Sequence, residues 1–151
     1  MASGVANVKD ANVKFFVDED TLGLAHLLTK IRPDVTFPGD PGGVTFKRQR
    51  PPCEIVRGTK DVDWIPDVAN KGWLVLTRDK NISKRTAEKK AVETAGAKLV
   101  AVTTSEDLST FGILEVVMCQ WRKIDEIAQL PGPFIYGATR ATFTKLDSFN
   151  T

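Results

Sequence analysis

Two acidic residues stand where apolar, strand-like runs of the sequence end. Asp18 follows VKFFV (13–17), and Asp79 comes two residues after the end of WLVLT (73–77). In a parallel sheet the carboxyl ends of the strands share one edge, and ligands bind in the crevice outside that edge. If both runs belong to one parallel sheet, the two carboxylates should point into the same crevice.

A third aspartate, Asp61, can be placed at this edge by its position at the start of a helix. The segment 61–71 has an acidic first turn and is followed by Gly72, a typical helix stop. Such a helix rises about 16 Å, and a strand over 73–77 runs back roughly the same distance. The start of the helix therefore returns to the end of the strand, where Asp79 lies.

Three carboxylates at one edge predict a metal site. Like charges raise one another's pKa and oppose folding unless a cation offsets them, and hard divalent cations prefer oxygen ligands. Mg²⁺ or Mn²⁺ held in this way can bind a phosphodiester oxygen, activate a water molecule and stabilise the leaving oxygen. This chemistry is that of a phosphodiester hydrolase.

Basic residues surround the last of these acids. They could hold the phosphates of a polyanionic substrate, and the residues in question are Arg78, Lys80, Lys84 and Arg85. A second basic cluster, FKRQR, occupies residues 46–50. The net charge of +2 does not by itself indicate nucleic-acid binding.

Each aspartate also has a simpler structural explanation. Asp18 and Asp61 could cap helices, and Asp79 could pair with a neighbouring base. The coincidence of all three at one sheet edge favours the metal site. The single histidine, His26, lies in the apolar stretch LGLAHLL and lacks the signatures of nucleophilic catalysis.

Strand-like and helical patterns alternate along the chain, which predicts an α/β layered domain with a mostly parallel central sheet. After the first strand, helical spacing runs from residue 20 or 21 to 31. Residues 32–60 are rich in proline and glycine, with at most a short strand at DVTF (34–37). Further elements are expected at 82–96 (helix), 98–102 (strand), 109–129 (helix) and 131–146 (one or two strands).

Length and composition are those of one globular domain. The 151 residues, 42% hydrophobic and 26% charged, predict a single domain over 1–151, with 1–12 as a flexible N-terminal segment. No apolar run approaches the roughly 20 residues of a membrane-spanning helix, and the N-terminus lacks the apolar centre of a signal peptide. A cytoplasmic protein without a membrane partner is the expectation.

The same residues carry a resemblance to a known family. FFVDED with its following helix, and DVDWIPDVANKGWLVLTRDK, resemble the PIN-like nuclease superfamily, more narrowly the PIN-like proteins related to VapC-type toxins of toxin–antitoxin pairs. QWRKIDEIAQLPGPFIY is also similar to that narrower group. In PIN domains an acid opens a helix, a glycine ends it, and the next strand closes on Thr-Arg-Asp or a near variant; here these are Asp61, Gly72 and 77–79.

The resemblance implies a three-layer α/β/α PIN-like domain and an endoribonuclease that depends on Mg²⁺ or Mn²⁺. Asp18, Asp61 and Asp79 match the acids of the family's catalytic site. The substrate implied is RNA, and a cognate antitoxin protein would be expected to block the acidic crevice. Homodimers are common among the relatives.

The identity of a fourth acid stays open. PIN nucleases usually carry another acid, often Glu, before the Asp61-type helix, and this region offers Asp34, Asp40 and Glu54. We favour Asp40 as a metal ligand because the glycines beside it let backbone and ligand approach closely. Asp63 is a rival to Asp61.

The two acids that follow Asp18 could each have more than one role. Glu19 or Asp20 could assist a metal through water, while Asp20 could equally cap the helix that follows.

Other classes of function are also compatible with parts of the sequence. If the fourth acid is absent, the protein could be a catalytically degenerate PIN-like protein that binds RNA or a partner without cutting. VKFFVDED also resembles the acidic start of a phosphoacceptor receiver domain, but no later strand clearly ends in the lysine such a domain needs. A non-enzymatic interaction protein has little support, because the polar side of 110–129 resembles an ordinary solvated face.

Overall fold

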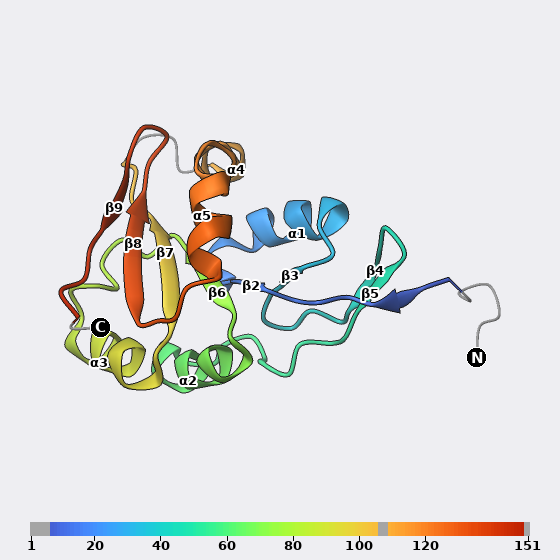
Figure 1. Ribbon diagram of the computed structural model, residues 1–151, viewed down its shortest axis with the longest axis horizontal. Coiled ribbons are helices and arrows are strands. Elements are labelled where there is room, and N and C mark those ends of the chain that lie inside the picture. Colours follow the sequence, from blue (N-terminus) through green and yellow to red (C-terminus); the bar gives the residue numbers. More distant parts are fainter. Residues whose placement is uncertain (1–6, 106–108, 150–151) are drawn as a thin grey trace.

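The computed structural model describes residues 7–105 and 109–149 and is built around a six-stranded sheet (Figure 1). Its strands are, in spatial order, β3 (Val35–Thr36), β2 (Phe15–Val17), β6 (Leu74–Thr77), β7 (Lys98–Val102), β8 (Phe134–Ala138) and β9 (Phe143–Lys145). The first five run parallel, and only β9 is antiparallel, to β8. The expected mostly parallel sheet is confirmed.

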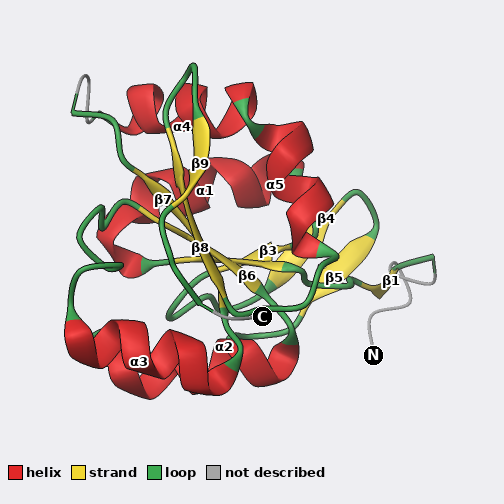
Figure 2. Ribbon diagram, turned by 60° about the vertical axis from the view of Figure 1, so that its left-hand side comes forward, coloured by secondary structure: helices red, strands yellow, loops and turns green. Residues whose placement is uncertain are grey.

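Helices cover both faces of this sheet, which gives three layers (Figures 1 and 2). One face carries α1 (Leu22–Ile31), α4 (Thr110–Cys119) and α5 (Trp121–Ala128), and the other carries α2 (Asp61–Lys71) and α3 (Thr86–Ala95). The three-layer α/β/α architecture is therefore confirmed.

Strand β2 explains why the sequence shows unbroken apolar runs. Phe15 and Val17 belong to the core under α1, α4 and α5, while Phe16 belongs to the core over α2 and α3. All three side chains are fully buried. Successive residues of a strand face opposite sides, so a strand covered on both sides must be apolar throughout.

The helix expected over 109–129 is in fact two helices, and that prediction is wrong. The break falls at Gln120, whose backbone (φ −105°, ψ 9°) leaves the helical region. Its side chain is buried, and the amide donates hydrogen bonds to the carbonyl oxygens of Thr139 (2.9 Å) and Arg140 (3.2 Å). The buried amide is thus satisfied by the turn between β8 and β9.

The irregular stretch 32–60 contains more structure than expected. Besides β3, it forms β4 (Gly43–Thr45) and β5 (Arg48–Arg50), which with β1 (Lys9–Asp10) make a second, three-stranded sheet in the order β1-β5-β4. This small sheet extends from one end of the molecule (Figure 1). Residues 1–12 were expected to be flexible; 1–6 lie outside the described residues, and β1 pairs with β5.

No helix within the described ranges combines the length and the apolar character needed to cross a bilayer.

Candidate active site

Asp18 and Asp79 lie at the same edge of the main sheet because β2 and β6 are parallel neighbours. Val17 is in register with Leu76, and the Asp18 backbone N–H donates to the Leu76 carbonyl oxygen at 2.9 Å. Asp18 therefore continues the strand pairing, and Asp79 follows the last residue of β6 by two positions. Both carboxylates stand at the carboxyl ends of their strands.

A buried hydroxyl connects the acids at this edge. Thr77, the last residue of β6, is fully buried, and its Oγ1 lies 3.1 Å from Asp18 Oδ2 and 2.9 Å from Asp20 Oδ2. The same oxygen accepts a hydrogen bond from the Asp79 backbone N–H at 3.1 Å. A hydroxyl has one proton, so two carboxylates share a single donor.

Burial and negative charge together perturb the acid of the cluster that is most buried. Burial, which has the largest effect, and the neighbouring charges of Asp20 and Asp61 together raise the pKa of Asp18 to about 7. Hydrogen bonds from Thr77 and from the Glu19 backbone lower this pKa but do not cancel the rise. A carboxyl group in this state binds a proton or another cation more readily than an ordinary aspartate does.

Asp61 reaches the cluster from the first residue of α2. Partial burial raises its pKa, and the charges of Asp79 and Glu88 add to the rise, whereas a hydrogen bond from Trp64 Nε1 (3.1 Å) opposes it. Asp61 is also among the charges that act on Asp18, while Asp63 is exposed on α2. Asp61, and not its rival Asp63, is therefore the aspartate of α2 whose charge acts on Asp18.

The capping explanations for Asp18 and Asp61 do not apply in the structure. Asp18 precedes a 3-10 turn (Glu19–Thr21) without a side-chain capping bond. The residue that precedes α2 is Lys60, and Asp61 lies within the helix. Asp20 does not cap α1 either, because its oxygens accept from the Thr77 hydroxyl and, at 3.4 Å, from the Arg78 backbone N–H.

Asp79 does pair with a base, but the base is Arg85. The guanidinium forms a two-point ion pair with both carboxylate oxygens, with Arg85 Nη2 2.9 Å from Asp79 Oδ1. The backbone N–H of Asn81 also donates to Asp79 Oδ1, at 3.1 Å. Arg85 therefore neutralises Asp79 and is not available as a free phosphate ligand while this pair is intact.

The other predicted phosphate ligands line hollows beside the cluster. A hollow of about 210 Å³ is bounded by Arg78, Asp79 and Lys80, and a second of about 350 Å³ by Lys80 and Lys84. Within the described part of the chain, Lys80 and Lys84 form no ion pair. These cations remain free to meet an anionic ligand.

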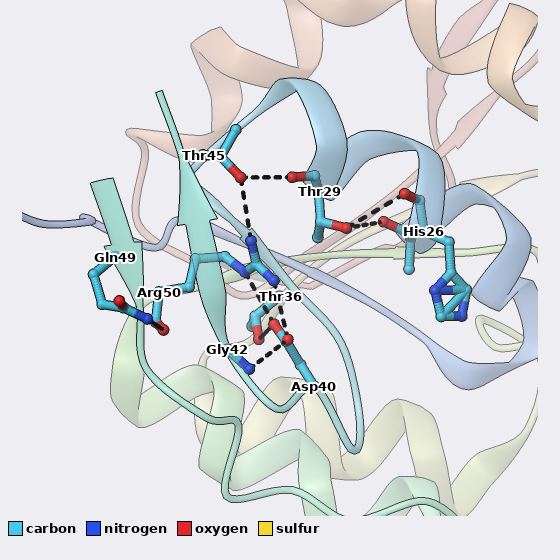
Figure 3. A network of polar contacts seen from close by, with 9 residues as sticks. His26, Thr29, Thr36, Asp40, Gly42, Thr45, Gln49 and Arg50 are labelled. Carbon is cyan, nitrogen blue, oxygen red and sulfur yellow. Dashed lines mark hydrogen bonds and ion pairs between the residues drawn. The ribbon is translucent and has the colours of Figure 1, made fainter. Parts of the chain in front are cut away.

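The structure gives Asp40 a different role from the predicted metal ligand (Figure 3). Its oxygens accept from Arg50 Nε and Nη2, each at 3.1 Å, from Thr36 Oγ1 at 2.9 Å and from the Gly42 backbone N–H at 2.8 Å. The Asp40 side chain is fully buried and its charge is balanced by Arg50. We therefore withdraw Asp40 from the set of metal ligands.

The remaining candidates for a fourth acid also lie in other contacts. Asp34 forms an ion pair with Arg32 (2.7 Å), and the exposed Glu54 one with Lys71 (3.5 Å). The additional acid that contacts the cluster is instead Asp20, which shares the Thr77 hydroxyl with Asp18. The acidic run at 18–20 pointed to Asp20 as a candidate. Nothing in the sequence indicated that Glu88 would lie close enough to Asp61 to raise its pKa.

The donors fit a hard divalent cation in their chemistry, although they do not yet converge. All are carboxylate oxygens, and the pKa of Asp18 is raised first by burial and then by the negative charges of Asp20 and Asp61. Among the described residues, no three acidic, histidine or cysteine side chains converge closely enough to enclose a metal ion. A cation on Asp79 would have to compete with Arg85, which pairs with both of its carboxylate oxygens.

The chain is similar in sequence to a known family and to a known protein. A family model described as a PIN like domain matches residues 13–104, which contain β2, α2, β6 and the three aspartates. A Mycobacterium tuberculosis protein named "Putative ribonuclease VapC45" is 30% identical over 80 residues, which are 53% of this chain and 57% of that protein. The chain thus spans little more than half of that relative, and no solved structure matches. The chain belongs to the PIN-like domain family.

Proposed function

We propose that the chain is a single PIN-like domain over residues 1–151 that hydrolyses RNA phosphodiester bonds with the help of a divalent metal ion. The observation that carries this proposal is the group of carboxylates from β2, α2 and β6 at one sheet edge, where the pKa of Asp18 is raised to about 7. Membership of the PIN-like family and the name of the relative support the assignment to ribonucleases.

Asp18, Asp61 and Asp79 would hold Mg²⁺ or Mn²⁺, with Asp20 assisting through water. The bound ion would polarise the phosphodiester and lower the pKa of a water molecule. Asp18 must lose its proton to act as a ligand, and the Thr77 hydroxyl holds the carboxylates of Asp18 and Asp20 in position.

The bases beside the cluster would bind the RNA strand. Lys80, Lys84 and Arg78 line the hollows next to Asp79 and would contact the phosphates that flank the cleaved bond. Arg85 would serve the same purpose once Asp79 releases it. A guanidinium can bind phosphate through two parallel hydrogen bonds, so Arg85 could pair with an RNA phosphate in place of the Asp79 carboxylate.

The relationship to VapC-type proteins supports a biological role as the toxin of a toxin–antitoxin pair in the cytoplasm. A cognate antitoxin would cover the acidic crevice, and the protein would form a homodimer, as its resemblance to the family implies. A catalytically degenerate RNA-binding protein is the second candidate. The ion pair between Asp79 and Arg85 favours it, because a permanent pair would keep Asp79 from binding a metal.

RNA cleavage tests the first candidate against the second. We expect the protein to cut a single-stranded RNA of mixed sequence in Mn²⁺ or Mg²⁺ and to stop when a chelator is added. Asp18→Asn and Asp79→Asn should both abolish cleavage. Cleavage in the chelator, or full activity in both variants, would disprove the mechanism; RNA binding without cleavage by the wild type would establish the degenerate alternative.

A further inference from the structure

The second basic cluster, residues 46–50, forms the turn and the second strand of a hairpin that is separate from the acidic edge. The hairpin, residues 43–50, consists of β4, a two-residue turn and β5. At its tip Phe46 exposes 72% of its surface, and Lys47 and Arg48 are exposed beside it. We propose that this hairpin is a second binding site for single-stranded RNA, an inference that rests on the proposed function in taking RNA as the ligand.

The turn has a backbone conformation that its residues disfavour. Phe46 (φ 49°) and Lys47 (φ 61°) both lie in the left-handed region, as a two-residue hairpin turn of this type requires. Asn-Gly is the sequence that suits such a turn, and a bulky residue there is strained. Stability alone does not explain a phenylalanine and a lysine at these two positions, whereas ligand binding does.

The base of the hairpin is held firmly, so the exposed tip is not simply a loose loop (Figure 3). Arg50, at the end of β5, is buried in its ion pair with Asp40 and lies 3.4 Å from Thr45 Oγ1. That hydroxyl in turn donates to the Thr29 carbonyl oxygen in α1 at 2.8 Å. The tip is therefore presented from a fixed platform.

Uncompensated positive charge gathers on this small sheet. Lys9 of β1 is in register with Arg48 of β5, so two cations lie side by side on one face. Like charges in such a pair are destabilising. Neither they nor Lys47 form an ion pair with any residue in the described ranges, and Asp10 is the single acid among the residues of the sheet and its turn.

An exposed aromatic ring with cations around it matches the repeating unit of single-stranded RNA. A base can stack on Phe46, and the phosphates on either side can meet Lys47 and Arg48. Thr29 lies near the end of α1 and Asp18 precedes its start, so the hairpin stands roughly 15 Å from the acidic cluster by the rise of that helix. One RNA strand that reaches both places would bind more tightly than through either alone.

The decisive variant replaces the turn by the sequence that the turn prefers. Phe46→Asn with Lys47→Gly should raise the unfolding temperature and at the same time weaken RNA binding. We expect the Kd for a labelled 20-nucleotide single-stranded RNA, measured by fluorescence anisotropy in chelator, to rise about fivefold or more from the lost stacking on Phe46 and the lost phosphate contact of Lys47. A raised unfolding temperature with an unchanged Kd would overturn the proposal.

A charge variant with a matched control isolates the phosphate contacts. Lys47→Gln with Arg48→Gln should reduce the slope of log K against log salt by about 1.4, since each contact to a single strand contributes about 0.7. Arg122→Gln with Lys123→Gln removes the same charge from exposed positions of α5 and should leave the slope unchanged. Equal slopes in both variants would overturn the proposal.

The same measurements separate this inference from the proposed function. Binding in chelator does not depend on cleavage, so hairpin variants that weaken binding would support the RNA site even if no cleavage is found. Unaffected binding together with metal-dependent cleavage would reject the hairpin and retain the nuclease. Polyglutamate bound more tightly than RNA at the hairpin would identify an acidic protein as the ligand and overturn the RNA site.

Discussion

Replacing Asp40 by asparagine should destabilise the fold strongly, because the aspartate balances a buried guanidinium. The Asp40 side chain is fully buried and that of Arg50 is 7% exposed. Asparagine keeps the shape of the side chain but leaves the positive charge of Arg50 without a partner. Removing one member of a buried ion pair costs about 3–5 kcal/mol, a large share of the roughly 5–15 kcal/mol by which a domain of this kind is stable.

Urea denaturation followed by fluorescence measures this loss directly. Asp34→Asn is the matched control, since the ion pair between Asp34 and Arg32 is partly exposed and should contribute less than about 1 kcal/mol. Replacing both partners, Asp40→Leu with Arg50→Met, should recover much of the stability, as apolar replacements of buried pairs commonly do. A loss below about 1 kcal/mol for Asp40→Asn would refute the reasoning.

The same variant distinguishes a structural residue from a metal ligand. If Asp40 belongs to the hairpin platform, the folded Asp40→Asn protein should bind Mn²⁺ with the affinity of the wild type in isothermal titration calorimetry. Loss of Mn²⁺ binding without loss of stability would instead restore Asp40 to the ligand set.

Three further predictions concern the acidic edge. The pKa of Asp18 is raised from 3.8 to about 7, so its contribution to stability is present below pH 3.8 and is lost as the pH rises through about 7. Asp18→Asn should remove this part of the pH dependence of the free energy of unfolding, measured by urea unfolding in chelator. Thr77→Val should cost about 1–3 kcal/mol in the same assay through the lost buried hydrogen bonds and should weaken Mn²⁺ binding at pH 7. Arg85→Gln should strengthen Mn²⁺ binding up to about fivefold, the equivalent of an exposed ion pair; weaker binding would show that Arg85 does not compete with the metal.

The layers of the fold were predictable because local signals agreed with the long-range structure. Apolar runs marked β2 and β6, which are buried on both faces. Gly72 marked the end of α2, where its φ of 73° suits glycine better than other residues. The break at Gln120 gave no such signal, because it depends on contacts with carbonyl groups about 20 residues later in the chain.

The hairpin formed by β4 and β5 was not predicted, for a related reason. Its turn is made by Phe46 and Lys47 instead of Asn-Gly, so no turn signal separated β4 from β5. Its pairing with β1 joins residues about 40 positions apart. Neither feature can be recognised from local propensity.

The position of the acidic edge was predictable from the sequence, but the side chains that pair with its aspartates were not. Asp18, Asp61 and Asp79 follow from where strands and a helix end or begin. The ion pair of Asp79 depends on how the chain turns back after β6, which brings Arg85 to it. The misassignment of Asp40 has the same origin, because Arg50 stands ten residues away in an element that the sequence did not reveal.

We propose that Asp61, together with the aspartates that follow β2 and β6, supports metal-dependent RNA cleavage. The most direct test of this role is the initial rate of RNA cleavage in saturating Mn²⁺ for Asp61→Asn and for Asp63→Asn, which remove the same charge two residues apart on α2. We predict a loss of more than about 100-fold for Asp61→Asn, beyond the effect of a residue that only supports a metal ligand, and a rate close to that of the wild type for Asp63→Asn. Equal rates in the two variants would contradict the account.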